Sequence, residues 1–187
     1  MQAVLERGRA AVGIRLLQDA FNTRSIALYA SLGFEVREPI LLMSGTPRSK
    51  PPSDVEVRPL RPDDLEVCGA LCTRVQGFER SRELADAVKL FSPVVAVRQG
   101  RITAYASTPT FWPLNHGVAE TEADMRALML GAAASTSEPL AFLLPVRQAD
   151  LFRWCLGEGM RVVKPMTLMT TGQYRDPAGC YFVSVLY

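Results

Sequence analysis

Residues 22–36 read NTRSIALYASLGFEV, and this stretch decides the fold. Asn22 or Thr23 is a good N-cap for a helix over residues 23–32, because a short polar side chain accepts a hydrogen bond from a free N–H of the first turn. Gly33 is a suitable end for that helix, since glycine adopts positive φ without steric cost. A strand follows from Glu35 to about Met43. The stretch therefore predicts a helix that leads directly into a strand.

The rest of the chain alternates helices and strands in the same way. The pattern predicts an α/β fold of the layered α+β kind, with a mixed sheet flanked by helices. Thr121 with Asp124 resembles a capping box, and Gln99-Gly100 is the expected hairpin turn. Helices are predicted at 2–12, 23–32, from 61, 81–90, 122–134 and 149–157, and strands at 14–18, 35–43, 55–60, 94–107 (a hairpin), 140–144, 161–172 and 180–187.

Composition narrows the classes of partner. The net charge is +2 over 187 residues, and the basic residues are scattered, which argues against nucleic acid or an anionic membrane as the main partner. No apolar run approaches the ~20 residues of a membrane span. Four cysteines without an export signal indicate reduced thiols and a cytoplasmic location. Cys68 and Cys72 lie one helical turn apart without further ligands nearby, so we expect helix packing and no metal site.

A shift of 126 positions aligns the start of the chain with its last third. Six identities fall in one ungapped register: Leu17 with Leu143, Gly33 with Gly159, Val36 with Val162, Pro39 with Pro165, Leu42 with Leu168 and Met43 with Met169. We interpret this as two copies of one unit. The expected division is residues 1–45 as the last part of a first domain, 46–54 as a linker and 55–187 as a second, divergent domain. A complete first copy would begin roughly seventy residues before Met1, if its length matches the second.

The motif in residues 22–34 resembles the second half of the GNAT acetyltransferase fold. Its members are Asn22, Ser25, Leu28, Tyr29, Leu32, Gly33 and Phe34. The resemblance implies an acetyl-CoA-dependent N-acetyltransferase that acts on a small-molecule or protein amine. It also implies that Tyr29 is the general acid that returns a proton to the coenzyme A thiolate, and that Asn22 and Ser25 contact the coenzyme. A phenol near pKa 10 matches a thiol in acid strength, which makes this transfer reasonable. The alternatives are a packed aromatic for Tyr29, a helix cap for Asn22 and core positions for Leu28, Leu32 and Phe34.

The family holds the coenzyme pyrophosphate on an Arg/Gln-x-x-Gly-x-Gly/Ala loop before a helix, and neither copy carries it. Ahead of the helix at 122–134 stand Glu120, Glu122 and Asp124, whose charges would repel a phosphate. Cys155 takes the place of Tyr29 in the second copy, and Gln148 takes the place of Asn22. We therefore expect the second copy to be a structural or substrate-shaping partner.

Three hypotheses follow for the whole chain. The first is an N-acetyltransferase that is inactive or impaired in this truncated form. The second is a non-catalytic GNAT-like module that binds a partner or ligand, and the third is a fragment. His116, with Phe111, Trp112 and Tyr105 nearby in sequence, is a further candidate for a pocket. The open sheet edges of the first copy suggest a homodimer or packing onto the second copy.

Overall fold

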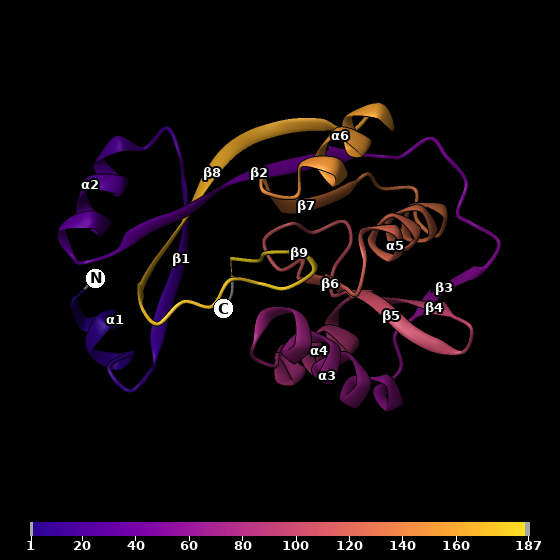
Figure 1. Ribbon diagram of the computed structural model, residues 1–187, viewed down its shortest axis with the longest axis horizontal. Coiled ribbons are helices and arrows are strands. Elements are labelled where there is room, and N and C mark those ends of the chain that lie inside the picture. Colours follow the sequence, from indigo (N-terminus) through magenta and orange to yellow (C-terminus); the bar gives the residue numbers. More distant parts are fainter. Residues whose placement is uncertain (1, 186–187) are drawn as a thin grey trace.

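The computed structural model describes residues 2–185 (Figure 1). The helices are α1 (Gln2–Arg7), α2 (Thr23–Ser31), a 3-10 turn (Pro62–Asp64), α3 (Leu65–Gln76), α4 (Ser81–Leu90), α5 (Glu122–Ala134) and α6 (Ala149–Gly157). The strands are β1 (Gly13–Asp19), β2 (Glu35–Gly45), β3 (Val55–Pro59), β4 (Val94–Arg98), β5 (Arg101–Ala106), β6 (Gly117–Ala119), β7 (Leu140–Pro145), β8 (Arg161–Gly172) and β9 (Cys180–Phe182). Mixed α/β architecture with curled antiparallel sheets and flanking helices confirms the predicted fold class.

Three predicted elements differ in extent. The first helix ends at Arg7 and is followed by turn hydrogen bonds from Arg9 N to Glu6 O and from Ala11 N to Gly8 O. The helix expected from residue 61 begins as a 3-10 turn, because the Asp64 carboxylate binds the Arg61 N–H at 2.8 Å and closes it. The last strand covers only 180–182, and residues 186–187 of the predicted span lie outside the described residues.

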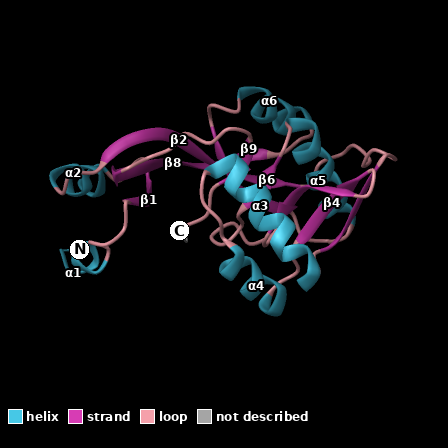
Figure 2. Ribbon diagram, turned by 60° about the horizontal axis from the view of Figure 1, so that its bottom comes forward, coloured by secondary structure: helices cyan, strands magenta, loops and turns pink. Residues whose placement is uncertain are grey.

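A five-stranded antiparallel sheet in the order β3-β4-β5-β6-β9 separates two cores. Helices α3 and α4 lie on one face, and α5 covers the other (Figure 2). Alternate residues of β4 divide between them: Val95 packs under α3, whereas Val94 and Ala96 pack under α5. The period of two along the strand thus explains why VVAVR carries apolar residues on both faces.

The second sheet has the order β1-β8-β2-β7, and it interleaves the two ends of the chain. Strand β8 lies between β1 and β2, which are connected by α2. Strand β2 lies between β8 and β7, which are connected by α6. Strands that are connected by a helix are therefore not neighbours in this sheet. Leu17 faces Leu168 in one pairing, and Leu42 faces Leu143 in another. The N-terminal segment is therefore built into the sheet of the C-terminal segment, which matches the expectation that it packs onto the second copy.

The predicted linker is partly anchored. The main-chain N–H groups of Arg48 and Ser49 both donate to a Glu158 carboxylate oxygen at 2.8 Å, and the Ser49 hydroxyl donates to the other oxygen at 2.7 Å. Pro47 is buried. Residues 47–49 of the predicted linker are therefore held against the fold, because the Glu158 carboxylate at the end of α6 satisfies their polar groups.

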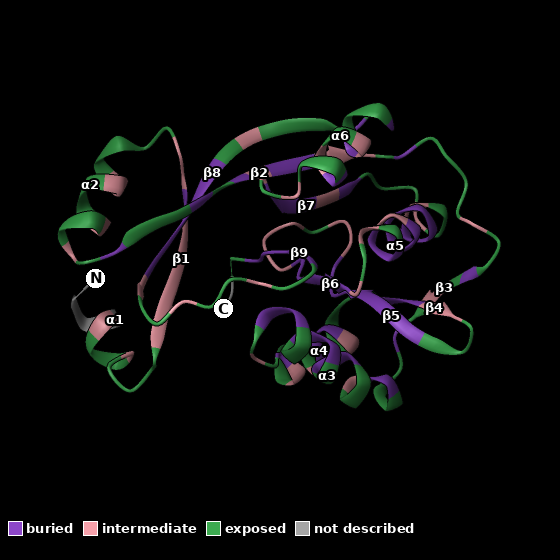
Figure 3. Ribbon diagram, in the orientation of Figure 1, coloured by how far each residue is buried: buried purple, intermediate pink, exposed green. Residues whose placement is uncertain are grey.

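The shift of 126 positions reappears in the element bounds. It carries α2 onto residues 149–157, which are the bounds of α6, and it carries β2 onto nearly all of β8. Gly33 and Gly159 have φ angles of 85° and 86°, as expected for equivalent helix ends. Their surroundings differ, because α6 buries Leu151 and Cys155 whereas no residue of α2 is buried (Figure 3). The common origin of the two units stays a prediction.

Candidate functional site

The three residues predicted to act in acetyl transfer lie on or next to α2. Asn22 is the N-cap, and its side-chain oxygen accepts the Ser25 N–H at 3.0 Å. Tyr29 lies one turn beyond Ser25, is half-buried, and packs edge-on against Phe34 with ring centroids 5.9 Å apart. None of the three residues lines either of the two cavities described below.

The core expectation for this motif holds only in part. Phe34 is buried, but Leu28 is 49% exposed, so placing Leu28 in the core is wrong. The reason is geometric: α2 projects at the end of the molecule that carries β1, away from both cores (Figure 1).

Under the shift of 126 positions, Gln148 corresponds to Asn22 and Cys155 to Tyr29, and these two residues make different contacts. The Gln148 side chain donates from Nε2 to the Tyr181 carbonyl at 2.7 Å and accepts the Tyr181 N–H at 3.1 Å. Cys155 is fully buried, and burial raises the pKa of its thiol to about 12. A neutral, inaccessible thiol cannot act as nucleophile or acid at neutral pH.

Strand β9 occupies the gap between β6 and β7. It pairs with β6 through Val118 and Tyr181, and just beyond it the Val183 N–H donates to the Leu143 carbonyl on β7 at 3.2 Å. The Phe182 ring stacks on Phe142 at 4.3 Å between centroids. The C-terminal segment thereby joins the two sheets, and its side chains fill the space between them.

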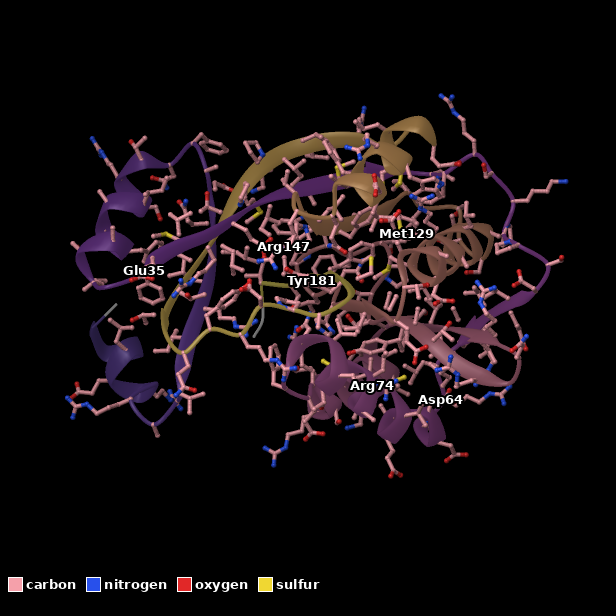
Figure 4. All side chains as sticks on the ribbon, in the orientation of Figure 1. Glu35, Asp64, Arg74, Met129, Arg147 and Tyr181 are labelled. Carbon is pink, nitrogen blue, oxygen red and sulfur yellow. The ribbon has the colours of Figure 1, made fainter. Side chains whose placement is uncertain are left out.

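A cluster of charged and phenolic groups fixes this segment, with Glu38 and Tyr181 buried and Arg147 and Asp176 exposed (Figure 4). The Tyr181 hydroxyl donates to Glu38 Oε1 at 2.7 Å, and Arg147 donates to Glu38 Oε2 at 2.9 Å. Arg147 also binds Asp176 at 2.7 Å. Burial, with the neighbouring Glu38 charge, raises the pKa of Tyr181, so the phenol stays protonated and neutral. The cluster therefore anchors the C-terminal segment to β2 and to the loop after β7.

The N-terminus of α5 is compensated by its own side chains. Thr121 Oγ1 accepts the Asp124 N–H at 3.1 Å, and Arg98 binds Asp124 at 3.1 Å. Arg101 and Arg74 both bind Glu120, at 2.6 and 3.0 Å. The carboxylates already stabilise the positive end of the helix dipole, and arginine side chains in turn pair with them. The acidic residues that the sequence places before and in the first turn of this helix are therefore found at its N-terminus.

His116, which the sequence offered as a pocket candidate, is buried beside a cavity. Its ring nitrogens lie 3.2 Å from the Tyr105 hydroxyl and 3.3 Å from Gln76 Oε1. Burial lowers the pKa of His116 well below its usual value, so the ring is neutral. Phe111 lines a second cavity next to it, whereas Trp112 lines neither.

Cys68 and Cys72 are buried, unpaired thiols on α3, and within residues 2–185 no group of three or more potential ligands could hold a metal ion. No helix in that range is long and apolar enough to cross a bilayer.

Comparison with known proteins identifies the fold. No protein-family model matches the sequence, and no curated protein matches it. Among solved structures, a candidate acetyltransferase from Pyrococcus horikoshii superposes on 100% of this chain and 63% of its own, with a TM-score of 0.75 and 14% identity. GCN5-related N-acetyltransferases from Anabaena variabilis (TM-score 0.57, 10% identity, 90% of this chain and 48% of its own) and Sphaerobacter thermophilus (0.51, 15%, 94% and 66%) are also similar. The chain has the GNAT acetyltransferase fold, and it spans less than two thirds of the length of each of these proteins.

Proposed function

We propose that this chain belongs to a tandem acetyl-CoA-dependent N-acetyltransferase in which residues 55–187 form a non-catalytic domain. Acyl transfer would take place at the first unit, around α2. The fold and its acetyltransferase neighbours support acyl transfer by resemblance. One observation carries the division of labour: the C-terminal segment fills the gap between β6 and β7, so the second unit has no open cleft there for a coenzyme.

In this proposal Tyr29 protonates the coenzyme A thiolate after the acceptor amine has attacked the thioester. The half-buried phenol lies on the helix that follows β1, and its ring packs edge-on against Phe34. Asn22 and Ser25 would contact the coenzyme at the start of the same helix. The acceptor would be a small-molecule or protein amine, and the buried free thiols suit a reducing cytoplasm.

Calorimetry with acetyl-CoA on the 187-residue chain tests the non-catalytic second domain. We expect no binding tighter than about 1 mM, because the α5 N-terminus is compensated by carboxylates and offers no cradle for a pyrophosphate. Micromolar binding would overturn the assignment. The coding sequence upstream of Met1, if it continues in frame with an Arg/Gln-x-x-Gly-x-Gly/Ala loop, supplies the protein for the second test.

That test measures thiol release by the upstream-extended protein. Tyr29→Phe should lower turnover at least tenfold and leave acetyl-CoA affinity nearly unchanged, since a general acid acts on the chemical step. Leu28→Ala is the matched control, because Leu28 is exposed on the same helix. Equal turnover in Tyr29→Phe and wild type would return Tyr29 to a packing role. Absence of thiol release in the extended wild-type protein would favour the non-catalytic module.

A further inference from the structure

A cavity of about 190 Å³ opens between α4 and the loop that joins β5 to β6. Its walls are apolar, with Leu84, Ala87 and Leu114 among them, and its floor carries buried polar side chains: Arg80, Ser107, Thr108 and His116. An apolar cavity of about 150 Å³ is large enough to bind benzene and stays dry when empty. The volume therefore suits one six-membered ring with a few further atoms.

The mouth of this cavity exposes large apolar side chains. Leu90 is 73% exposed and Phe91 is 38% exposed, at the end of α4. Phe91 stacks on Phe111 with centroids 6.1 Å apart and planes 20° apart, so two aromatic rings face solvent as one platform. Exposed apolar groups at the edge of a concave apolar site are typical of ligand contacts.

The charges around the cavity are already matched, which limits the charge of a ligand. Arg80 binds Glu83 at 2.6 Å and Ser184 at 2.8 Å. Asp86 is bound by Lys89 at 3.2 Å. His116 is neutral, because burial lowers its pKa. An anion would have to compete with Glu83 for Arg80, and a cation would meet acids that are exposed and already paired.

We propose that this cavity binds a small neutral aromatic molecule, with its ring between α4 and the β5–β6 loop and against the Phe91–Phe111 platform. The polar floor offers hydrogen bonds to a single ring N–H or hydroxyl group. The Ser107 hydroxyl already donates to the Leu114 carbonyl at 2.7 Å and accepts the His116 N–H at 2.8 Å, so its remaining lone pair is the acceptor available to such a group. This inference does not depend on acyl transfer.

Titration with indole, followed by ligand-observed NMR and calorimetry on the whole chain, tests the site. Nine non-hydrogen atoms in an apolar cavity make a dissociation constant below about 1 mM reachable. Phe91→Ala should weaken indole binding at least fivefold. Phe21→Ala is the matched control, because Phe21 is an exposed phenylalanine on the β1–α2 loop that does not line the cavity. The affinity of this variant for indole should stay within twofold of that of wild type.

Two further probes test the charge argument. Benzoate and benzylamine should each bind at least fivefold more weakly than indole. If benzoate bound more tightly than indole, the cavity would prefer an anion that pairs with Arg80, and the proposal of a neutral ligand would be wrong. If benzylamine bound more tightly, the cavity would prefer a cation that pairs with Glu83 or Asp86, and the proposal would also be wrong. Magnetisation transfer between indole protons and the Ala87 methyl group locates the ligand without any variant. Absence of saturable indole binding, or transfer to methyl groups elsewhere only, would refute the site.

Discussion

The Gln148 amide supplies both hydrogen bonds to the Tyr181 main chain, so Gln148→Ala removes two contacts that hold the C-terminal segment. Tyr181 is buried, and its N–H and carbonyl would be left without these partners. A buried polar group without a partner costs about 1–3 kcal/mol. Because the two groups are adjacent and some relaxation is expected, we predict a loss of about 2–4 kcal/mol in the free energy of unfolding.

The assay for Gln148→Ala is urea unfolding followed by circular dichroism, combined with hydrogen exchange of the Tyr181 and Val183 amides. Both amides should lose protection more than those of β4, since the segment opens locally. Asn22→Ala is the matched control: it stands at the equivalent position of the first unit but only caps an exposed helix, so its loss should be about 1 kcal/mol. A Gln148→Ala loss no larger than that of Asn22→Ala, with unchanged exchange at Tyr181, would refute the reasoning.

Three further predictions concern packing and pH. A Cβ at Gly131 would lie 2.3 Å from a valine of β3. Gly131→Ala should therefore lower the free energy of unfolding by about 1–3 kcal/mol through overpacking, and the melting temperature should fall with it. Gly157→Ala, with open space around the added methyl group, should leave the melting temperature unchanged. Burial holds the pKa of Tyr181 above its unfolded value near 10, so the contribution of Tyr181 to the free energy of unfolding is present below pH 10 and falls above it. In urea unfolding at pH 9–11, the free energy of unfolding of Tyr181→Phe should decrease less steeply with pH than that of wild type. Parallel curves would contradict this prediction. The pKa of Asp64 is lowered by its arginine partner on β3, so the contribution of Asp64 to the free energy of unfolding is present above about pH 4 and lost as the pH falls below it. Asp64→Asn should therefore make the free energy of unfolding depend less steeply on pH in the acid range. Asp63→Asn, on the surface, should leave this dependence as steep as in wild type.

Elements with strong local signals were predictable from sequence. Thr121 caps α5 at the expected residue, and Gln99-Gly100 makes the hairpin turn with positive φ at both positions. Helix α4 has the predicted bounds. The Thr121 cap and the Gln99-Gly100 turn each depend on residues within a few positions of one another, so the information is contained in the stretch itself.

The arrangement of strands was not predictable in the same way. Placing β2 between β8 and β7 depends on pairing residues that lie 95 to 135 positions apart, and an apolar strand such as PILLM offers the same faces to many partners. Strand β9 was expected, but its place between β6 and β7 was not. The only local signal was Gln148, a long amide at the position where the first unit has Asn22.

The two units show how surroundings decide what an equivalent residue does. Asn22 and Gln148 hold the same position before helices of the same length, with similar main-chain angles. Asn22 is exposed and binds its own helix, whereas Gln148 is long enough to bind a strand that has entered the gap beside it. The gap in the second unit is closed by main chain from the same molecule. A ligand that entered there would have to displace β9 together with its anchors at Glu38 and Arg80, and this is the reason for our proposal that residues 55–187 do not catalyse acyl transfer.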